Sequence, residues 1–364
     1  MTATQLYHTW IKRLRHMRVG ENQARLRTIA WMMVGMMMSR SVHLSHIARK
    51  IPSVGQQSSL VKRLSRLLQN GAVRVREWYD PLAQALLQEV VESGQAVRLI
   101  IDGTKIGGGH RLLMVALAYR RRSLPIAWTW VKGSRGHSLA TTQVALFASV
   151  RRLLPAGASV LVVGDSEFGA VEVMRYFDQW GWHYVLRQKG RTGLTTRVAQ
   201  VWQRLDTLVA QPGDSAWCEQ SRLTQRFAFP VNLLAHWQVG EKQPWLLATN
   251  LPTKQLTLLA YRRRMWIEEM FADLKRHGFD LESTHLRHFL RLSRLTLFVA
   301  LLYLGCIAFG VDTVKRGLRH WVDRSDRRDL SIFRIGFDWV ERCLTNAIPF
   351  TIPLLPYFEK VYGS

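Results

Sequence analysis

Residues 97–103 read VRLIIDG, an apolar run that ends in an acid, Asp102, and a glycine. A second run, SVLVVGD at residues 159–165, has the same form and ends in Asp165. Short apolar runs bounded by turn residues are typical of buried strands. Sites in open α/β sheets are built at the carboxyl ends of strands, so we expect both acids to lie at such an edge.

The segments around these two runs predict a mixed sheet. The glycine turn at 107–109 separates the first run from a strand at 112–119, and a third strand follows at 124–131, which makes an antiparallel meander. Beyond it, helical and strand-like segments alternate, and alternation of this kind implies parallel pairing. The helices are expected at 138–154 and 170–180 and the last strand of this series at 183–187.

The remaining patterns suggest how the chain is divided. Residues 190–240 lack a helical period and predict β structure, while residues 255–277 predict a helix that Gly278 ends. We therefore expect an α/β fold with flanking helical domains. Its parts are a helical, basic domain at 1–94, a core at 95–189 and 244–284, a β-rich insertion at 190–243, and a helical C-terminal domain at 285–364.

The charge of the chain predicts a polyanionic partner. Its 51 Lys and Arg residues against 26 Asp and Glu residues give a net charge of +25, and nucleic acid rewards many cations at once. The first 76 residues hold 14 Lys and Arg and one acid, Glu21. Two short helices expected there, at 41–50 and 58–68, resemble a helix-turn-helix, which predicts binding of duplex DNA. A basic face in contact with solvent is the alternative.

Compartment and membrane association can also be assessed. The three cysteines, Cys218, Cys306 and Cys343, are far apart and form no CxxC pair, as expected for a protein of the reducing cytosol. The one apolar run of near-spanning length, residues 295–311, has 17 uncharged residues and predicts a buried helix rather than a membrane span. A basic membrane-surface protein is the alternative class that this run leaves open.

The two strand-end acids allow two interpretations. If their strands are neighbours, the carboxylates of Asp102 and Asp165 repel each other unless one is protonated or a divalent cation lies between them. Hard oxygen ligands suit Mg²⁺ or Mn²⁺. The alternative is that each aspartate caps a following helix.

Four polar residues recur at helical spacing in the segment after residue 260. Tyr261, Arg264, Glu268 and Lys275 are separated by three, four and seven positions, which places them on one stripe of a regular helix. This stripe either faces solvent or lines a polar site. In a polar site, Glu268 supplies a third carboxylate, and Arg264 and Lys275 hold phosphate groups.

With the two aspartates, this signature resembles the Tyr-Arg-Glu-Lys signature and DDE triad of the insertion-sequence-four group of cut-and-paste bacterial transposases. The spacing matches at every position, and the local sequence RMWIEE at 264–269 matches as well. The resemblance covers residues 97 to 280, and it implies an RNase H-like catalytic core interrupted by a β-rich insertion. One departure is Ser166, which follows Asp165 where an arginine often stands.

The resemblance implies a transposase. Asp102, Asp165 and Glu268 would be the catalytic residues and would bind two Mg²⁺ or Mn²⁺ ions. The transposon end would be nicked, its 3′-hydroxyl would form a hairpin, water would open the hairpin, and the free end would join target DNA. The implied partners are double-stranded DNA, at the transposon ends and the target, and a second copy of the chain, without a membrane. The implied location is the bacterial cytoplasm, with the nucleoid.

The resemblance also assigns the residues that would hold the DNA. Trp245 matches a tryptophan that stacks on a base flipped out of the duplex, whereas a core role is the alternative. Tyr261, Arg264 and Lys275 would contact the phosphate near that base. Two other functions stay open: a regulatory DNA-binding protein without catalytic activity, and another RNase H-like nuclease.

Overall fold

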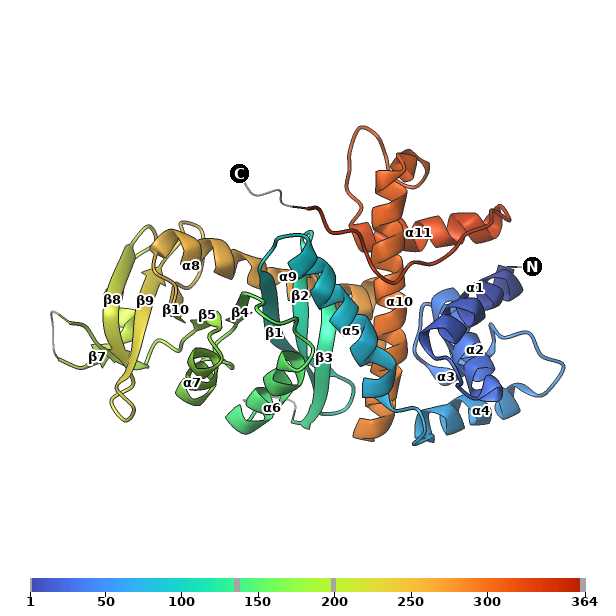
Figure 1. The fold of residues 1–364 in the computed structure, drawn as a ribbon, viewed down its shortest axis with the longest axis horizontal. Helices are drawn as coiled ribbons and strands as arrows, with labels where there is room; N and C mark the ends of the chain where they lie inside the picture. The colour runs from blue at the N-terminus through green and yellow to red at the C-terminus, as the bar shows by residue number, and fades with distance from the viewer. Residues whose placement is uncertain (1, 134–137, 198–200, 361–364) are drawn as a thin grey trace.

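A ten-stranded sheet runs through most of the molecule (Figure 1). The computed structural model describes residues 2–133, 138–197 and 201–360. Its strands lie in the order β3-β2-β1-β4-β5-β10-β9-β8-β6-β7. The first three, joined by tight turns, form the antiparallel meander that the sequence predicts: β1 (Val97–Ile106), β2 (His110–Tyr119) and β3 (Arg122–Lys132).

Two parallel strands continue the sheet beside β1. β4 pairs in parallel with β1, and β5 pairs in parallel with β4. Three antiparallel strands followed by two parallel ones form an RNase H-like core, so the predicted fold class is confirmed. The bounds here are α6 (Ala140–Arg151), β4 (Val160–Gly164), α7 (Val171–Gln179) and β5 (His183–Arg187).

The segment predicted as a β-rich insertion extends this same sheet. It is antiparallel throughout, and β10 joins it to the core by pairing with β5 on one side and β9 on the other. The bounds are β6 (Gly193–Thr195), β7 (Gln203–Arg204), η1 (Leu205–Leu208), β8 (Ser215–Leu223), β9 (Phe229–His236) and β10 (Trp245–Thr249).

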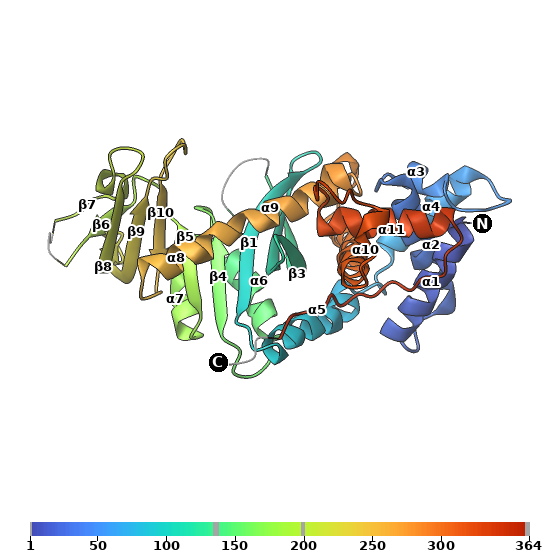
Figure 2. The same ribbon diagram turned by 90° about the horizontal axis from the view of Figure 1, so that it is seen from above.

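A long, irregular helical segment crosses one face of the sheet (Figure 2). α8 contacts β4 and β5, and α9 contacts β1, β2 and β3. The helix predicted over 255–277, ended by Gly278, is present, but 3₁₀ and π turns interrupt its α-helical geometry. The bounds are α8 (Lys254–Tyr261), the 3₁₀ turn η2 (Arg262–Arg264), α9 (Met265–Ala272) and the π turn η3 (Asp273–His277).

The N-terminal part is helical, and its two short central helices fall where the sequence places a helix-turn-helix-like pair. α4 buries Leu60, Leu64, Leu67 and Leu68, whose three- and four-residue spacing forms one apolar face. The bounds are α1 (Thr2–Met17), α2 (Gln23–Ser39), α3 (Leu44–Ala48), α4 (Gln57–Gln69) and α5 (Val75–Glu92).

The C-terminal part is built on one long apolar helix, α10, which contacts α11, α2, α4, α5 and β3. Within the described residues, α10 is the one helix long and apolar enough to cross a membrane, and 89% of that window is buried inside the protein. This burial is what the sequence predicts for residues 295–311. The bounds are η4 (Leu281–Ser283), α10 (Phe289–Lys315), η5 (Leu318–Trp321) and α11 (Ile332–Thr345), and residues 346–360 form no helix.

Two glycines allow α10 and α11 to touch along their backbones. A Cβ atom added at Gly310 would meet the carbonyl oxygen of Ile332, and one added at Gly336 would meet the carbonyl oxygen of Cys306. Glycine is therefore required on both helices at this crossing.

Candidate active site

The two predicted aspartates lie side by side where β4 ends. Asp165 directly follows β4, but β1 continues to Ile106, so the prediction that Asp102 ends its strand was wrong. Ile101 of β1 pairs with Gly164 of β4, so Asp102 and Asp165 each follow the last paired residue of a parallel pair. The sequence predicts this juxtaposition from the two apolar runs alone. Asp102 is buried, whereas Asp165 is partly exposed.

Burial perturbs both carboxyl groups. Burial, followed by the charge of Asp165, raises the pKa of Asp102 to about 7 against the opposing effects of Arg264 and the Gly103 N–H. Burial likewise raises the pKa of Asp165. The N–H of Glu167, which donates to Oδ1 of Asp165 at 2.9 Å, lowers that pKa but does not outweigh burial. Two carboxyl groups whose charged forms are disfavoured in this way are typical of functional sites and of cation ligands.

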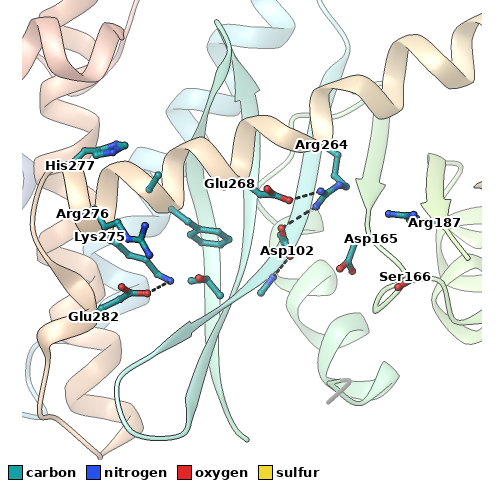
Figure 3. Close-up of a pocket in the computed structure, with 14 residues that line it drawn as sticks. Asp102, Asp165, Ser166, Arg187, Arg264, Glu268, Lys275, Arg276, His277 and Glu282 are labelled. Atoms are coloured by element: carbon teal, nitrogen blue, oxygen red, sulfur yellow. Dashed lines mark hydrogen bonds and ion pairs between the residues drawn. The ribbon is translucent and has the colours of Figure 1, made fainter. Parts of the chain in front are cut away.

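Arg264 lies between two of the three predicted acids (Figure 3). Its Nη1 is 3.4 Å from Oδ2 of Asp102, and its Nη2 pairs with Oε1 of Glu268. Although burial alone would lower the pKa of Arg264, the nearby Tyr261, Asp102 and Glu268 outweigh it and raise that pKa. The guanidinium group therefore partly neutralises the site.

The three acids line one cavity but do not form one ligand set. Within the described ranges, no three His, Cys, Asp or Glu side chains are grouped so that they could hold a metal ion. Asp102 and Asp165 fit a divalent cation, because both are carboxylates whose pKa stays raised although Arg264 lies nearby. Glu268 does not complete the set in this conformation, because it is paired with Arg264 and its side chain is 44% exposed.

The cavity has a volume of about 560 Å³, and as many Lys and Arg side chains as carboxyl groups line it. Lys275 lines it, with Nζ 2.6 Å from Oε1 of Glu282. Arg187, Arg276 and His277 also line it, although the sequence analysis did not single them out. Arg187 could have been found, because it ends strand β5, which pairs with the strand that Asp165 follows. No sequence signal marks the other two, which the π turn brings to the cavity.

Tyr261 and Trp245 lie together but outside the cavity lining. Their rings meet edge to face with centroids 5.1 Å apart. Tyr261 is buried, its hydroxyl has no hydrogen-bond partner among the described residues, and burial raises its pKa to about 12. Trp245 is half-buried on β10. Its predicted stacking on a base and the predicted phosphate contact of Tyr261 both stay predictions.

A second ion pair holds the loop that carries Asp165. Glu167 accepts a hydrogen bond from Nη1 of Arg111 at 3.0 Å and from the N–H and hydroxyl of Ser138 at 2.8 Å each. These partners lower the pKa of Glu167 against the opposing effect of burial. The sequence analysis noted this segment only as a departure from the family pattern. In the structure it joins β2, the start of α6 and the Asp165 loop.

Comparison with known proteins gives a family and a distant structural likeness. Residues 93–304, more than half of the chain, match the family model described as transposase DDE domain. No curated protein sequence matches the chain. Among solved structures, one described as a cryo-EM structure of the piggyBac transposase synaptic complex with hairpin DNA matches with a TM-score of 0.42 and 10% identity. That match covers 97% of this chain and 84% of the other.

Proposed function

The chain belongs to the transposase DDE domain family, and from this premise we propose that it is a metal-dependent DNA endonuclease and strand transferase. Its substrates are the two ends of a transposable element and a target duplex. Within the family, the Tyr261, Arg264, Glu268 and Lys275 spacing favours the insertion-sequence-four group.

The observation that carries the proposal is the pair of buried aspartates at one sheet edge. Asp102 and Asp165 are adjacent, both have a raised pKa, and they open into a cavity that is also lined by Arg264, Lys275 and Glu268. Holding two uncompensated carboxylates together costs stability, and binding of a divalent cation recovers it. We propose that Mg²⁺ or Mn²⁺ binds here, as two ions per site. The bound ions would activate the attacking hydroxyl and stabilise the leaving oxygen of an in-line displacement.

The side chains around the aspartates have separate roles in this proposal. Arg264 and Lys275 hold the phosphate groups of the strand that is cut, since both line the cavity and each now pairs with a glutamate. DNA phosphates would replace Glu268 on Arg264 and release that carboxylate toward Asp102 and Asp165. Trp245 and Tyr261, already in contact, would hold the flipped base and its phosphate.

The proposed reaction has four steps. Water nicks the transposon end, the free 3′-hydroxyl attacks the opposite strand to form a hairpin, water opens the hairpin, and the 3′-hydroxyl joins target DNA. Two ends must be held together, so a homodimer on DNA is expected. We propose that the reaction takes place in the bacterial cytoplasm, at the nucleoid.

The test is cleavage of duplexes that carry the DNA flanking this chain's own gene. Wild-type protein should nick them with Mg²⁺ or Mn²⁺ and not with chelator, and Asp102→Asn should reduce nicking by at least a hundredfold. Asp326→Asn, on an exposed acid paired with Arg324, is the matched control and should cut normally. Cutting by Asp102→Asn at the wild-type rate would contradict the proposal.

A second candidate is a DNA-binding protein without catalytic activity. The observation that favours it is the ion pair between Arg264 and Glu268, which keeps the third acid away from the aspartates. Titration calorimetry with Mn²⁺ in the presence of DNA separates the two functions. Heat of binding that Glu268→Gln abolishes supports the enzyme, whereas no binding in wild-type protein supports the second candidate.

A further inference from the structure

A second cavity lies on the other side of the catalytic helix from the carboxylates. It has a volume of about 400 Å³ and is formed by β1, the β2–β3 turn, the η2–α9 segment, the end of α5 and the C-terminal residues. Arg98 and Asp102 lie four residues apart on β1, so their side chains share one face of the sheet, about 13 Å apart along the strand. Two neighbouring arginines of η2 line different cavities. Arg264 contacts Asp102 in the first cavity, whereas Arg263 lines the second.

Three arginines line this cavity with one acid among them. They are Arg98, Arg120 and Arg263, and the acid is Glu359. In the part of the chain that the structure describes, the Arg98 side chain forms no hydrogen bond or ion pair, and the Glu359 carboxylate forms no ion pair. Arg263 donates to the carbonyl oxygen of Leu259 at 2.9 Å. Burial and then the charge of Arg98 lower the pKa of Arg263, as expected where like charges are held together.

The backbone at the cavity edge is also unusual. Arg120 and Arg121 form the two-residue turn between β2 and β3, with φ angles of 43° and 62°. Hairpin turns with two positive φ angles favour Asn-Gly, because other side chains are strained there. An arginine pair at these positions costs stability and adds two positive charges, and residues held in strained conformations cluster at functional sites.

Aromatic rings complete the walls. The guanidinium group of Arg263 lies 5.9 Å from the ring centre of Trp266, and that of Arg120 lies 5.8 Å from the ring centre of Tyr119. Guanidinium groups placed over aromatic rings and left without acids are suited to phosphate groups of nucleic acid, which they bind through their planar fork.

We infer that the cavity formed by Arg98, Arg120 and Arg263 binds a backbone phosphate of a DNA segment other than the one cut at the carboxylates. The catalytic helix separates the two cavities, so a strand seated at Asp102 does not itself enter the second one. A protein that handles two ends and a target always has such a further segment close by. This inference rests on the proposed function, because it takes DNA as the partner.

The experiment measures capture of a second duplex by a preformed complex. Full-length Asp102→Asn protein, which does not cut, is saturated with end duplex, and a fluorescent duplex of unrelated sequence is then titrated at several salt concentrations. Arg98→Ala and Arg263→Ala should each weaken capture severalfold and reduce the slope of log K against log salt by about 1, while binding of the end duplex changes little. Arg98→Lys, which keeps the charge, should retain the slope. Arg328→Ala removes an equal charge from an exposed loop and is the control.

The possible outcomes separate the two proposals. Absence of any binding to end duplex contradicts the proposed function itself. Normal end binding with unchanged capture by both alanine variants overturns the inference, and so does equal weakening of both duplexes. In another outcome, pyrophosphate raises the melting temperature of the parent protein but not of Arg98→Ala, while capture of the second duplex is unchanged. That result assigns the cavity to a free phosphorylated ligand and also overturns the inference. Because the arginines repel each other, the melting temperature of Arg98→Ala should equal or exceed that of the parent protein, whereas a structural role would lower it.

Discussion

Arg264 and Asp102 are 162 positions apart in the chain and are joined by an ion pair of 3.4 Å inside the candidate active-site cavity. The contact fixes the 3₁₀ turn of the crossing helix over strand β1. Among the described residues, Arg264 is the one arginine whose guanidinium group contacts both Asp102 and Glu268.

Arg264→Ala should therefore reduce catalysis more than folding. Loss of a preorganised cation beside a reacting phosphate costs about 10²–10³ in rate. Nicking of end duplex under single-turnover conditions is the measurement. Arg262→Ala, an exposed neighbour on the same turn, is the control and should cut normally. A similar loss of rate in both variants would refute a specific role for Arg264.

The raised pKa of Asp102 should be visible as a pH-dependent loss of stability. Its pKa is about 7 when folded and near 3.8 when unfolded, so the unfolded chain releases this proton first. Between about pH 4 and pH 7 this group lowers the free energy of unfolding by up to about 4 kcal/mol, and the loss is complete above pH 7.

Urea unfolding of wild-type protein and Asp102→Asn, both in chelator, checks this expectation. The variant should gain stability relative to wild type as pH rises from 5 to 8. A difference between the two proteins that stays constant over that range would contradict the assignment.

Arg122→Ala should destabilise the fold strongly. Nε of Arg122 is 2.8 Å from Oδ2 of Asp273, whose side chain is 2% exposed, so truncation leaves a buried charge unpaired. Such losses cost about 3–5 kcal/mol. Urea unfolding gives the value, and the double variant with Asp273→Asn should recover part of it. Arg334→Ala breaks a more exposed pair with Asp338 and should cost less than about 1 kcal/mol.

Glu167→Gln should weaken catalysis through Asp165 without removing a group that touches DNA. The carboxylate of Glu167 holds Arg111 and Ser138, and its N–H donates to Asp165. Changes to residues that orient a metal ligand typically cost about 10- to 100-fold in metal affinity or activity. The Mn²⁺ concentration for half-maximal nicking should rise accordingly. Glu172→Gln, exposed on α7, should leave it unchanged, and an equal rise there would refute the orienting role.

Gly310→Ala should open the contact between α10 and α11. The added Cβ meets the backbone of α11 rather than a flexible side chain, so the helices must separate. Overpacking of this kind costs about 1–3 kcal/mol, measured by thermal or urea unfolding. Gly71→Ala, where nothing lies within 4 Å of the added atom, is the control. A Gly310→Ala protein as stable as wild type would show that the crossing can relax.

The sheet and the two aspartates were predictable because they depend on local signals. An apolar run bounded by turn residues marks a buried strand, and the alternation of helix and strand after residue 138 favours parallel pairing for the second run. Arg187 is the last residue of strand β5, so its position near Asp165 was predictable from the end of that strand. The π turn at Asp273–His277 has no comparable signal, because its conformation depends on contacts such as Arg122 with Asp273, far apart in sequence.

Helical spacing alone was insufficient for the signature residues. A regular stripe would place Tyr261 beside Arg264, yet the 3₁₀ turn directs Arg264 to Asp102 while Tyr261 packs against Trp245. The pairing of Glu268 with Arg264 was not predictable either, because the spacing equally allows the Glu268 carboxylate to join Asp102 and Asp165 around a cation.

The position of β10 has a mechanical consequence. Because it is hydrogen-bonded to β5 on one side and to β9 on the other, the insertion cannot pivot against the catalytic edge without breaking a strand ladder. The insertion and the core sheet therefore move as one rigid unit. A force applied to the outer strands of the insertion would be carried through the sheet to β5, which presents Arg187 to the candidate active-site cavity.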